Sequence, residues 1–516
     1  MTNASFKRIA AAAAAFALVA VGVSGTVAPA NAASKTTSLT IGYDSDPVPS
    51  GYDPALYAAG QRLFMESLYD SLFYPDGKGG TLPGLAKSYT QSADKTSLTM
   101  TIRPGVKFSD GTTLDAATVK ANLDRVFTDA KTNYTSLQIF VAKGSAEIKS
   151  VTTSGNDVTV NFAAAQPTAP TLFTGEAGMI VAKAQAAVSN SLALSPDGSG
   201  PYSLSSGGTI KGNTYKLTKN KTYWNSAAYP ATTLTYKILS NPQARANALA
   251  TGQVDVAVAV AGSTVDFLKG RKAGLVSLGG YISMLVFWNG GQNPPGPKPL
   301  VGDKNVRLAL SYATDRDALV TALNKGDRAT ANYIPKGQPG FDPSLDSGYA
   351  YNPTKAKSLL SAAGVTGLTL ETVYGDPTQA PLFQALTDQW AKVGVTLKAH
   401  LAANTGELFA AVGSEAFGYF QTNVANPQGL AAGVFVNGFG NFMHTQNAAV
   451  NSSLGAALGS PTPANLMKLN RALVDEAWLM PLREGYSYTG YNKKTVKAPA
   501  VGVDGANPML SAIKLK

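Results

Sequence analysis

The chain has 516 residues, of which 44% are hydrophobic and 15% are charged, and its formal net charge is +11. This length and composition exclude a single small module and a disordered chain, and they are typical of a globular protein with mixed α and β structure. The 43 Lys and Arg residues are scattered rather than gathered into short basic runs, so we expect no nucleic-acid partner.

The N-terminus has the features of a secretory signal peptide. Lys7 and Arg8 precede the apolar run Ile9–Val23, and Ala30–Ala32 follows as an A-x-A cleavage site. The apolar run has about 15 residues, fewer than the roughly 20 that a membrane-spanning helix needs. We therefore expect residues 1–32 to be a signal peptide, and the remaining 484 residues to be exported to the periplasm or cell envelope as a soluble protein.

The chain contains no cysteine and only two histidines, His400 and His444. This excludes disulfides, a cysteine-based metal site and a lipid-modified cysteine after the signal peptide. Two histidines far apart in the sequence do not make a metal site, so we expect no metal and no other cofactor.

The first clear elements lie between residues 98 and 111. Leu98, Met100 and Ile102 alternate with threonines, which predicts a half-buried strand. Phe108–Gly111 ends in Asp-Gly, a pair typical of tight turns, and we interpret it as structural. Gly200–Tyr202 is interpreted in the same way, as a rigid entry into a strand.

Four segments have the spacing of amphipathic helices. Their apolar faces are Val119, Leu123, Val126 and Phe127; Val306, Ala309, Leu310 and Ala313; Ala356, Leu359, Leu360 and Ala363; and Phe383, Leu386, Trp390 and Val393. Thr113 or Asp115 is the N-cap of the first helix, and Gly364 and Gly394 end the last two.

Strands alternate with these helices. Val254–Val260 places a valine at every second position, which predicts another strand. The alternation of strands and helices favours α/β domains. On the helix that contains Val306, we assign Lys304 and Arg307 to a solvated face.

Ten short segments, spread in order over nearly the whole chain after residue 32, carry a further pattern. They are Tyr52–Ala55, Glu66–Leu72, Leu82–Ala86, Ile102–Gly111, Gly200–Tyr202, Tyr223–Trp224, Ala248–Asp255, Val306–Arg316, Ala356–Gly364 and Lys392–Val395. This ordered series resembles the family 5 extracellular solute-binding proteins of ABC importers, the peptide, nickel and opine class. Ile102–Gly111 is similar to the family signature itself.

The resemblance implies an α/β, periplasmic-binding-protein-like fold of three domains, with two closing lobes and one inserted domain. Transferred to this sequence, lobe I holds residues 33–72, 194–285 and 486–516, inserted domain II holds 73–193, and lobe III holds 286–485. Ligand stabilises a closed state of such a receptor, so that the importer distinguishes loaded from empty protein by shape. No bond is made or broken, so the chain is not expected to be an enzyme.

The resemblance also implies partners. The receptor binds a small molecule as a monomer and delivers it to an ABC permease, whose ATPase subunits are separate chains; the sequence contains no G-x-x-x-x-G-K-[ST] loop of its own. An oligopeptide or dipeptide is the leading ligand class. A polar non-peptide, such as an oligosaccharide or an opine, is the alternative.

The ligand class depends most on the segment Gly418–Pro427. In peptide-binding members, a similar segment carries an Asp four residues before the Pro, where it pairs with the peptide's α-ammonium; Asn423 stands there in this chain. An amide compensates no charge, and an unpaired buried charge is costly. Either Asp46, Glu66 or another acid takes this role, or the ligand is not a peptide.

The candidate ligand-binding residues are mainly aromatic and amide side chains near the expected hinge and the Gly418–Pro427 segment. Trp288 and Asn289 follow an apolar strand, where an aromatic wall with an amide suits a ligand. The complete set is Asp46, Tyr52, Phe287, Trp288, Asn289, Tyr419, Phe420, Gln421, Asn423, Asn441 and Phe442. Ordinary core packing is the alternative interpretation of the aromatic members.

A secreted hydrolase is the remote alternative. A serine hydrolase would need His400 or His444 as its base, and the sequence contains no G-x-S-x-G nucleophile elbow. A glycosidase needs only two carboxylates, which 32 acidic residues nominally provide.

Overall fold

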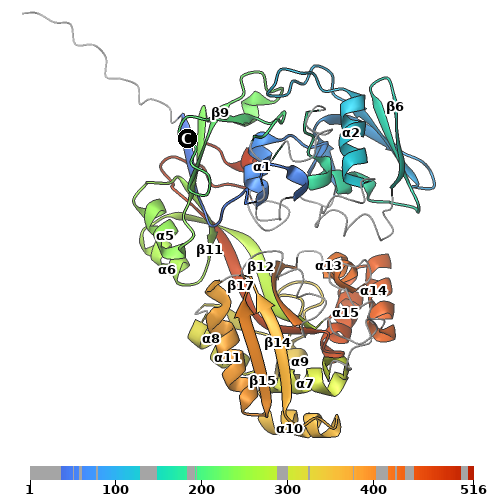
Figure 1. The fold of residues 1–516 in the computed structure, drawn as a ribbon, viewed down its shortest axis with the longest axis vertical. Coiled ribbons are helices and arrows are strands. Elements are labelled where there is room, and N and C mark those ends of the chain that lie inside the picture. The colour runs from blue at the N-terminus through green and yellow to red at the C-terminus, as the bar shows by residue number, and fades with distance from the viewer. Residues whose placement is uncertain are drawn as a thin grey trace, which may run out of the picture. The chain divides into compact units, whose positions relative to one another are not determined.

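The computed structural model describes residues 37–516 apart from 50, 57–60, 77–79, 128–147, 183–191, 193–194, 288–299, 324–325, 376, 403–416, 425–426, 436–446 and 501–508. It combines β-sheets with helices, which confirms the α/β class (Figure 1). The predicted signal peptide and Trp288, Asn289, Asn441, Phe442 and His444 lie outside the described residues. In the part of the chain that is described, no helix is long and apolar enough to cross a membrane.

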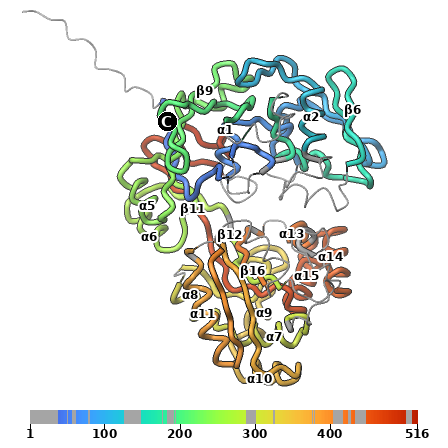
Figure 2. Tube along the Cα trace, in the orientation of Figure 1, coloured from blue at the N-terminus to red at the C-terminus, as the bar shows by residue number. Residues whose placement is uncertain are grey.

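The largest sheet has nine strands in the order β16-β12-β17-β11-β1-β10-β9-β8, with β13 paired to β17. The bounds are β1 Ser38–Tyr43, β8 Tyr202–Leu204, β9 Thr214–Lys219, β10 Thr233–Ile238, β11 Val256–Val260, β12 Gly274–Phe287, β13 Arg328–Ala329, β16 Phe417–Asn423 and β17 Leu479–Tyr491. β11 pairs with β1 on one side and β17 on the other, so it joins strands from the beginning and the end of the sequence in one sheet (Figure 2).

Two strands of this sheet are much longer than the rest. β12 and β17 pair antiparallel from Gly274 opposite Tyr491 to Val286 opposite Leu479. One end of the pair packs with two hydrophobic clusters around β1, β10 and β11, and the other end enters a cluster that begins at Ile282. The pair is therefore a continuous connection between separate cores.

The clusters around β1, β10 and β11 include three helices, α1 (Arg62–Leu68), α5 (Pro242–Ala250) and α6 (Ser263–Gly270). Pro242 begins α5, and the side chain of Asn241 caps it by accepting a hydrogen bond from the backbone N–H of Ala244.

A second group of elements forms its own core, which apart from Ala55 consists of buried residues between 72 and 182. Its four-stranded sheet has the order β4-β5-β7-β6, the small sheet β2-β3 lies nearby in sequence, and one helix covers the larger sheet. The bounds are β2 Phe73–Pro75, β3 Thr81–Pro83, β4 Ala86–Gln91, β5 Ser97–Ile102, α2 Ala116–Phe127, β6 Ile148–Ser154 and β7 Asp157–Phe162.

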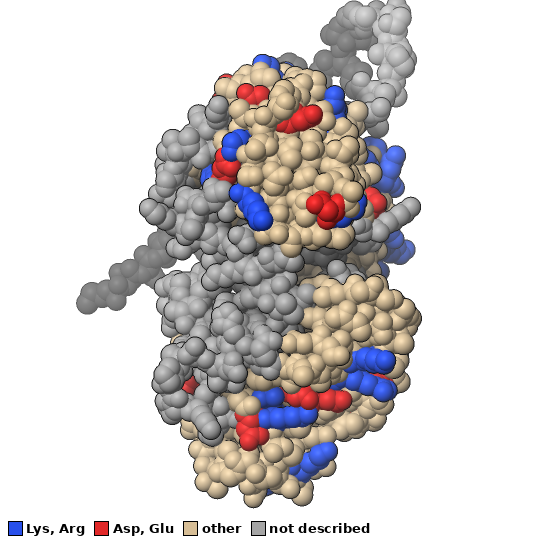
Figure 3. All heavy atoms as spheres, turned by 90° about the vertical axis from the view of Figure 1, so that its right-hand side faces the viewer, with Lys and Arg blue, Asp and Glu red and all other residues tan. Residues whose placement is uncertain are grey.

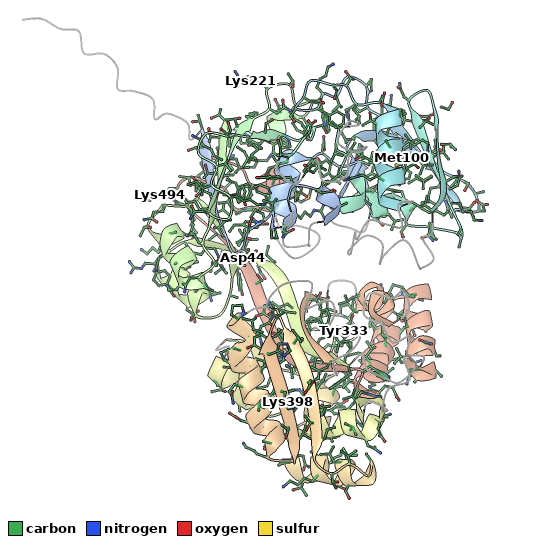
Figure 4. All side chains as sticks on the ribbon, in the orientation of Figure 1. Asp44, Met100, Lys221, Tyr333, Lys398 and Lys494 are labelled. Atoms are coloured by element: carbon green, nitrogen blue, oxygen red, sulfur yellow. The ribbon has the colours of Figure 1, made fainter. Side chains whose placement is uncertain are left out.

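Two predictions for this region are confirmed. Leu98, Met100 and Ile102 of β5 are buried while the threonines between them are half-buried, and Met100 lies inside the core (Figure 4). The predicted helix is α2, and Asp115 caps it by accepting a hydrogen bond of 2.7 Å from the backbone N–H of Thr118.

The third group is built around the core that begins at Ile282. It holds β12, β16 and β17, the parallel pair β14-β15 and most of the helices. The further bounds are α7 Lys304–Ala313, α8 Arg316–Leu323, α9 Pro343–Gly348, α10 Pro353–Ala362, β14 Leu368–Tyr374, α11 Ala380–Ala391, β15 Val395–Leu401, α13 Pro427–Phe435, α14 Ala448–Gly459 and α15 Pro463–Asp475.

The expected helices of this group are confirmed as α7, α10 and α11. Gly364 and Gly394 follow α10 and α11 with φ of 68° and 85°, the left-handed conformation that ends a helix at little cost only for glycine. Tyr333, which Figure 4 labels, links α13 and α15. Its backbone N–H donates to Asn470 of α15, and its hydroxyl donates to the carbonyl of Pro427 at the start of α13.

The strand predicted from Val254–Val260 is confirmed as β11, which begins at Val256. It is buried on both faces, because it lies inside the sheet with a separate core on each side. Val256 and Val258 belong to one core, and Ala257 and Val260 belong to the other. Ala259 has a φ of 51°, which places Val260 on the same side as Ala257.

The assignment of Arg307 to a solvated face is wrong. Its side chain is buried, its guanidinium lies 3.6 Å from the centre of the Trp478 ring, and it donates to the carbonyls of Val301, Gly302 and Glu476. A buried arginine that donates to several carbonyls keeps its charge without a carboxylate partner. Elsewhere, basic and acidic side chains are interspersed on the face drawn in Figure 3.

Candidate functional site

Polar side chains from three adjacent strands share one face of the large sheet. Ser283 of β12 lies opposite Gln421 of β16 and opposite Arg483 of β17. Residues directly opposite on neighbouring strands share a face, and so do residues two positions apart on one strand. Tyr281 and Tyr419 therefore belong to the same face.

Arg483 is the centre of this arrangement. One terminal nitrogen donates to the Tyr281 hydroxyl at 2.9 Å and forms an ion pair with Asp327, which precedes β13. The other terminal nitrogen donates to the Tyr419 hydroxyl at 3.3 Å and to Gln421 Oε1 at 3.2 Å. We call these five residues, Tyr281, Asp327, Tyr419, Gln421 and Arg483, the Arg483 cluster.

The ion pair in the cluster is largely shielded from water. The side chains of Arg483 and Asp327 are 11% and 6% exposed. Burial lowers the pKa of Arg483, but Tyr419, Tyr281 and Asp327 together raise it above its ordinary value. Burial raises the pKa of Tyr281 to about 12, and the Arg483 charge opposes this rise. Arg483 thus stays a cation that Asp327 neutralises.

The middle of this face carries a buried serine hydroxyl. Ser283 is fully buried, and its Oγ has no hydrogen-bond partner among the described residues. A buried hydroxyl without a partner costs about 1–3 kcal/mol, so it marks a position where a bound molecule or water is favoured.

The position of Asp327 is fixed by the ion pairs of the residue that follows it, Arg328. Arg328 lies opposite Glu484 of β17 and forms ion pairs of 2.5 Å with Glu484 and 2.6 Å with Asp346. The Glu484 side chain is only 1% exposed. Two consecutive residues of β17 therefore have different roles: Arg483 belongs to the polar face, and Glu484 anchors β13.

Gly485 leaves the space that the Arg483 cluster occupies. A Cβ at this position would lie 2.4 Å from Tyr281 Oη and 2.5 Å from Asp327 Oδ1. Gly485→Ala is expected to displace both groups and to lower the free energy of unfolding by about 1–3 kcal/mol. Urea denaturation measures this. Gly270→Ala, where an added Cβ meets nothing within 4 Å, is the control, and equal stability of the two variants would contradict the packing argument.

The structure separates the candidate residues predicted from sequence. Tyr419 and Gln421 join the Arg483 cluster. Asp46 instead accepts hydrogen bonds from the Tyr215 hydroxyl at 2.7 Å and the backbone N–H of Val48, and Tyr52 is 4% exposed in the core around β1. Both lie beside strands far from β16 in the sheet order.

Two aromatic candidates are packed into the core of the third group. Phe287 is 3% exposed and makes an edge-to-face contact with Phe417. Phe420 lies opposite Met284 and packs against the same core. The backbone of Asn423 pairs with Tyr281, two residues along β16 from Gln421.

Sequence reasoning missed Tyr281, Asp327 and Arg483. A signal for Arg483 exists: it interrupts the apolar run Trp478–Leu482, and a charge inside a buried strand needs a partner. Asp327 has no comparable signal, because a charged residue in a loop is normally solvated.

A metal centre receives no support from the described part of the chain, which holds no group of three or more His, Cys, Asp or Glu side chains able to bind an ion. His400 is exposed at the end of β15.

The architecture is that of a periplasmic binding protein. The periplasmic binding protein DppA of Helicobacter pylori, in complex with the peptide STSA, aligns with a TM-score of 0.77 at 19% identity over 93% of this chain and 98% of its own. The binding protein AgaA of A. tumefaciens R10, in complex with agropinic acid, has the same TM-score at 22% identity and the same coverage.

The family is identified by sequence. The model of the bacterial extracellular solute-binding proteins, family 5 Middle, matches residues 81–457, and the chain belongs to this family. The glutathione-binding protein of Salmonella paratyphi A is 28% identical over 436 residues, which are 80% of this chain and 81% of that protein. The chain is thus a solute-binding protein of an ABC importer rather than an enzyme, with a small-molecule ligand and a permease as partners.

Proposed function

We propose that this receptor captures an oligopeptide or dipeptide and delivers it to its permease. The observation that carries the proposal is the Arg483 cluster, in which Tyr419 and Gln421 come from the segment that resembles the peptide-contacting segment of the family. The name of the glutathione-binding relative and the peptide bound in the DppA structure support the same ligand class.

The proposed domains are those expected from the sequence, with lobe I at 33–72, 194–285 and 486–516, domain II at 73–193 and lobe III at 286–485. The hydrophobic clusters support the division, because most residues of one cluster fall in domain II, most of another in lobe III and most of the remaining two in lobe I. β12 and β17 are the proposed hinge, because they run from the cores of lobe I into that of lobe III. Export by the signal peptide at residues 1–32 completes the proposal.

A polar non-peptide ligand is the second candidate. It is favoured by the charges at the site: Asn423 stands where a carboxylate would pair with a peptide's ammonium, and Asp327 neutralises Arg483. The agropinic acid bound in AgaA shows that the same fold serves a ligand of another class in that protein.

Identification of the natural ligand separates the two candidates. The protein is purified from its native host without refolding, measured by native mass spectrometry, and denatured to release any bound molecule. A series of peptides would support the first proposal. A sugar or sugar-derived acid would support the second, and a protein that turns over ester or glycoside substrates would overturn both.

Asn423→Asp tests the charge at the amine position. If the ligand is a peptide bound as in the relatives, the new carboxylate is expected to strengthen binding of a free-amine tripeptide about tenfold or more, equivalent to about 1.4 kcal/mol. Isothermal titration calorimetry measures the change. The N-acetylated tripeptide, which lacks the ammonium, should gain nothing, and Asn225→Asp is the matched control variant. An unchanged affinity for the free-amine peptide would contradict this role of position 423.

A further inference from the structure

A cavity lies at the end of the large sheet opposite to the Arg483 cluster. It has a volume of about 560 Å³ and is lined by residues of β8 and of the segments that flank it, together with Tyr52, Leu68 at the end of α1, and Ser109. Pockets that bind small molecules have volumes of about 300–1,000 Å³, so this cavity has the size for one. Figure 1 labels α1 and β9, the neighbours of this region.

This cavity is distinct from the Arg483 cluster. β8 is the last strand of the sheet at one edge and β16 is the last at the other, with six strands between them in the sheet order. A molecule bound beside β8 therefore contacts neither Gln421 nor Arg483.

The lining is rich in hydroxyl groups. Six Ser and Thr residues line the cavity, and of the described residues that do so, none is charged. The six are Ser109, Ser195, Ser203, Ser205, Ser206 and Thr209. A charged ligand would lose its hydration here without a counter-charge among the described lining residues, and an apolar ligand would leave the hydroxyls unpaired.

Several of these hydroxyls already donate a hydrogen bond within the protein. Ser109 donates to Asp197 at 2.8 Å, Thr209 donates to the carbonyl of Ser205 at 2.7 Å, and Ser205 donates to the carbonyl of Gly207 at 3.2 Å. A hydroxyl that donates its proton keeps lone pairs that accept. The cavity is thus best complemented by a ligand with several O–H donors.

Contacts within the protein fix the walls of the cavity. The chain at Gly198 and Gly200 lies so close to Leu68 that a Cβ would approach the Leu68 backbone to 2.0 Å and 2.4 Å respectively. Two aromatic lining residues are tied down as well, because the Tyr202 hydroxyl donates to Ala231 and the carbonyl of Tyr52 accepts from Tyr69. A prebuilt site loses less conformational freedom on binding than a flexible one.

We propose that this cavity is a second binding site, specific for a neutral, hydroxyl-rich small molecule such as a sugar or polyol. The lining hydroxyls accept hydrogen bonds from the ligand's O–H groups. The site does not depend on which solute the Arg483 cluster binds.

The proposal is tested by calorimetric titration of the exported chain with glucose, maltose, trehalose and glycerol at millimolar concentration. Glucuronate and glucosamine are the charged counterparts. We expect saturable binding of at least one neutral probe, with at least tenfold weaker binding of its charged counterpart. Binding of the charged probes alone, or of no probe, overturns the proposal.

Variants assign any binding to this cavity. Ser203→Leu, which fills it from β8, is expected to weaken binding at least tenfold, whereas Ser88→Leu on the exposed face of β4 should leave it unchanged. Ser206→Leu is the second filling variant, because Ser206 is exposed and tolerates substitution without loss of the fold. Gln421→Ala separates the two sites: if it abolishes sugar binding, the sugar occupies the Arg483 cluster and the second site is wrong.

Discussion

Arg483→Met is expected to lower the free energy of unfolding by about 3–5 kcal/mol and to abolish ligand binding. The substitution leaves Asp327, whose side chain is 6% exposed, as a buried carboxylate without its cation. It also removes the donor that orients Tyr419 and Gln421. Urea denaturation at pH 7 gives the stability, and titration with the identified solute gives the binding.

The double variant Arg483→Met/Asp327→Asn isolates the ion pair. It is expected to recover much of the lost stability, because no uncompensated charge remains, but not the binding. Lys398→Met is the matched control, since its pair with Glu371 is 65% and 59% exposed and an exposed pair contributes about 0–1 kcal/mol. If Arg483→Met and Lys398→Met lose equal stability, the buried pair is not the centre described above.

Asp70 is expected to make the folded protein less stable as the pH rises from about 4 to about 6, by about 3 kcal/mol. Burial raises the pKa of Asp70 from its ordinary 3.8 to about 6, although hydrogen bonds from Tyr74 and Trp224 oppose the rise. Between these two values the folded state holds a proton that the unfolded state releases. The contribution of Asp70 is therefore fully present below about pH 4 and is lost as the pH passes about 6.

Asp70→Asn removes this titration. The difference in free energy of unfolding between the variant and the parent chain should shift in favour of the variant by about 3 kcal/mol between about pH 4 and about pH 7. Denaturation curves at several pH values measure it, and taking the difference cancels the other carboxylates. Asp266→Asn is the control, because Asp266 is 85% exposed on α6. A pH-independent difference for Asp70→Asn would show that this carboxyl is not protonated in the fold.

The local elements were accessible from sequence because each depends on residues close together in the chain. β5, α2, α10 and α11 follow from side-chain periodicity and from caps such as Asp115 and Gly364. β11 also follows from periodicity, but the burial of both its faces depends on the two separate cores that cover them. The prediction of a solvated Arg307 was wrong for a related reason, because its partners Trp478 and Glu476 are about 170 positions away in the chain.

Two of the five residues of the Arg483 cluster were accessible from sequence by another route. Tyr419 and Gln421 were found because an aligned segment of the family marks them, whereas Asp327 and Tyr281 become neighbours of Arg483 only through strand pairing. The distance along the chain between Tyr281 and Arg483 is 202 residues, and no local pattern reports a contact over such a separation.

The sequence by itself determined the family, through ten ordered segments, together with the α/β class and the helices and turns that short-range periodicity and capping specify. Only the tertiary structure decided which charges are buried together, where Arg483 finds Asp327, and where hydroxyls gather around a cavity beside β8. The physical reason is that propensity and capping act between residues a few positions apart, whereas burial, charge pairing and cavities depend on which distant strands become neighbours.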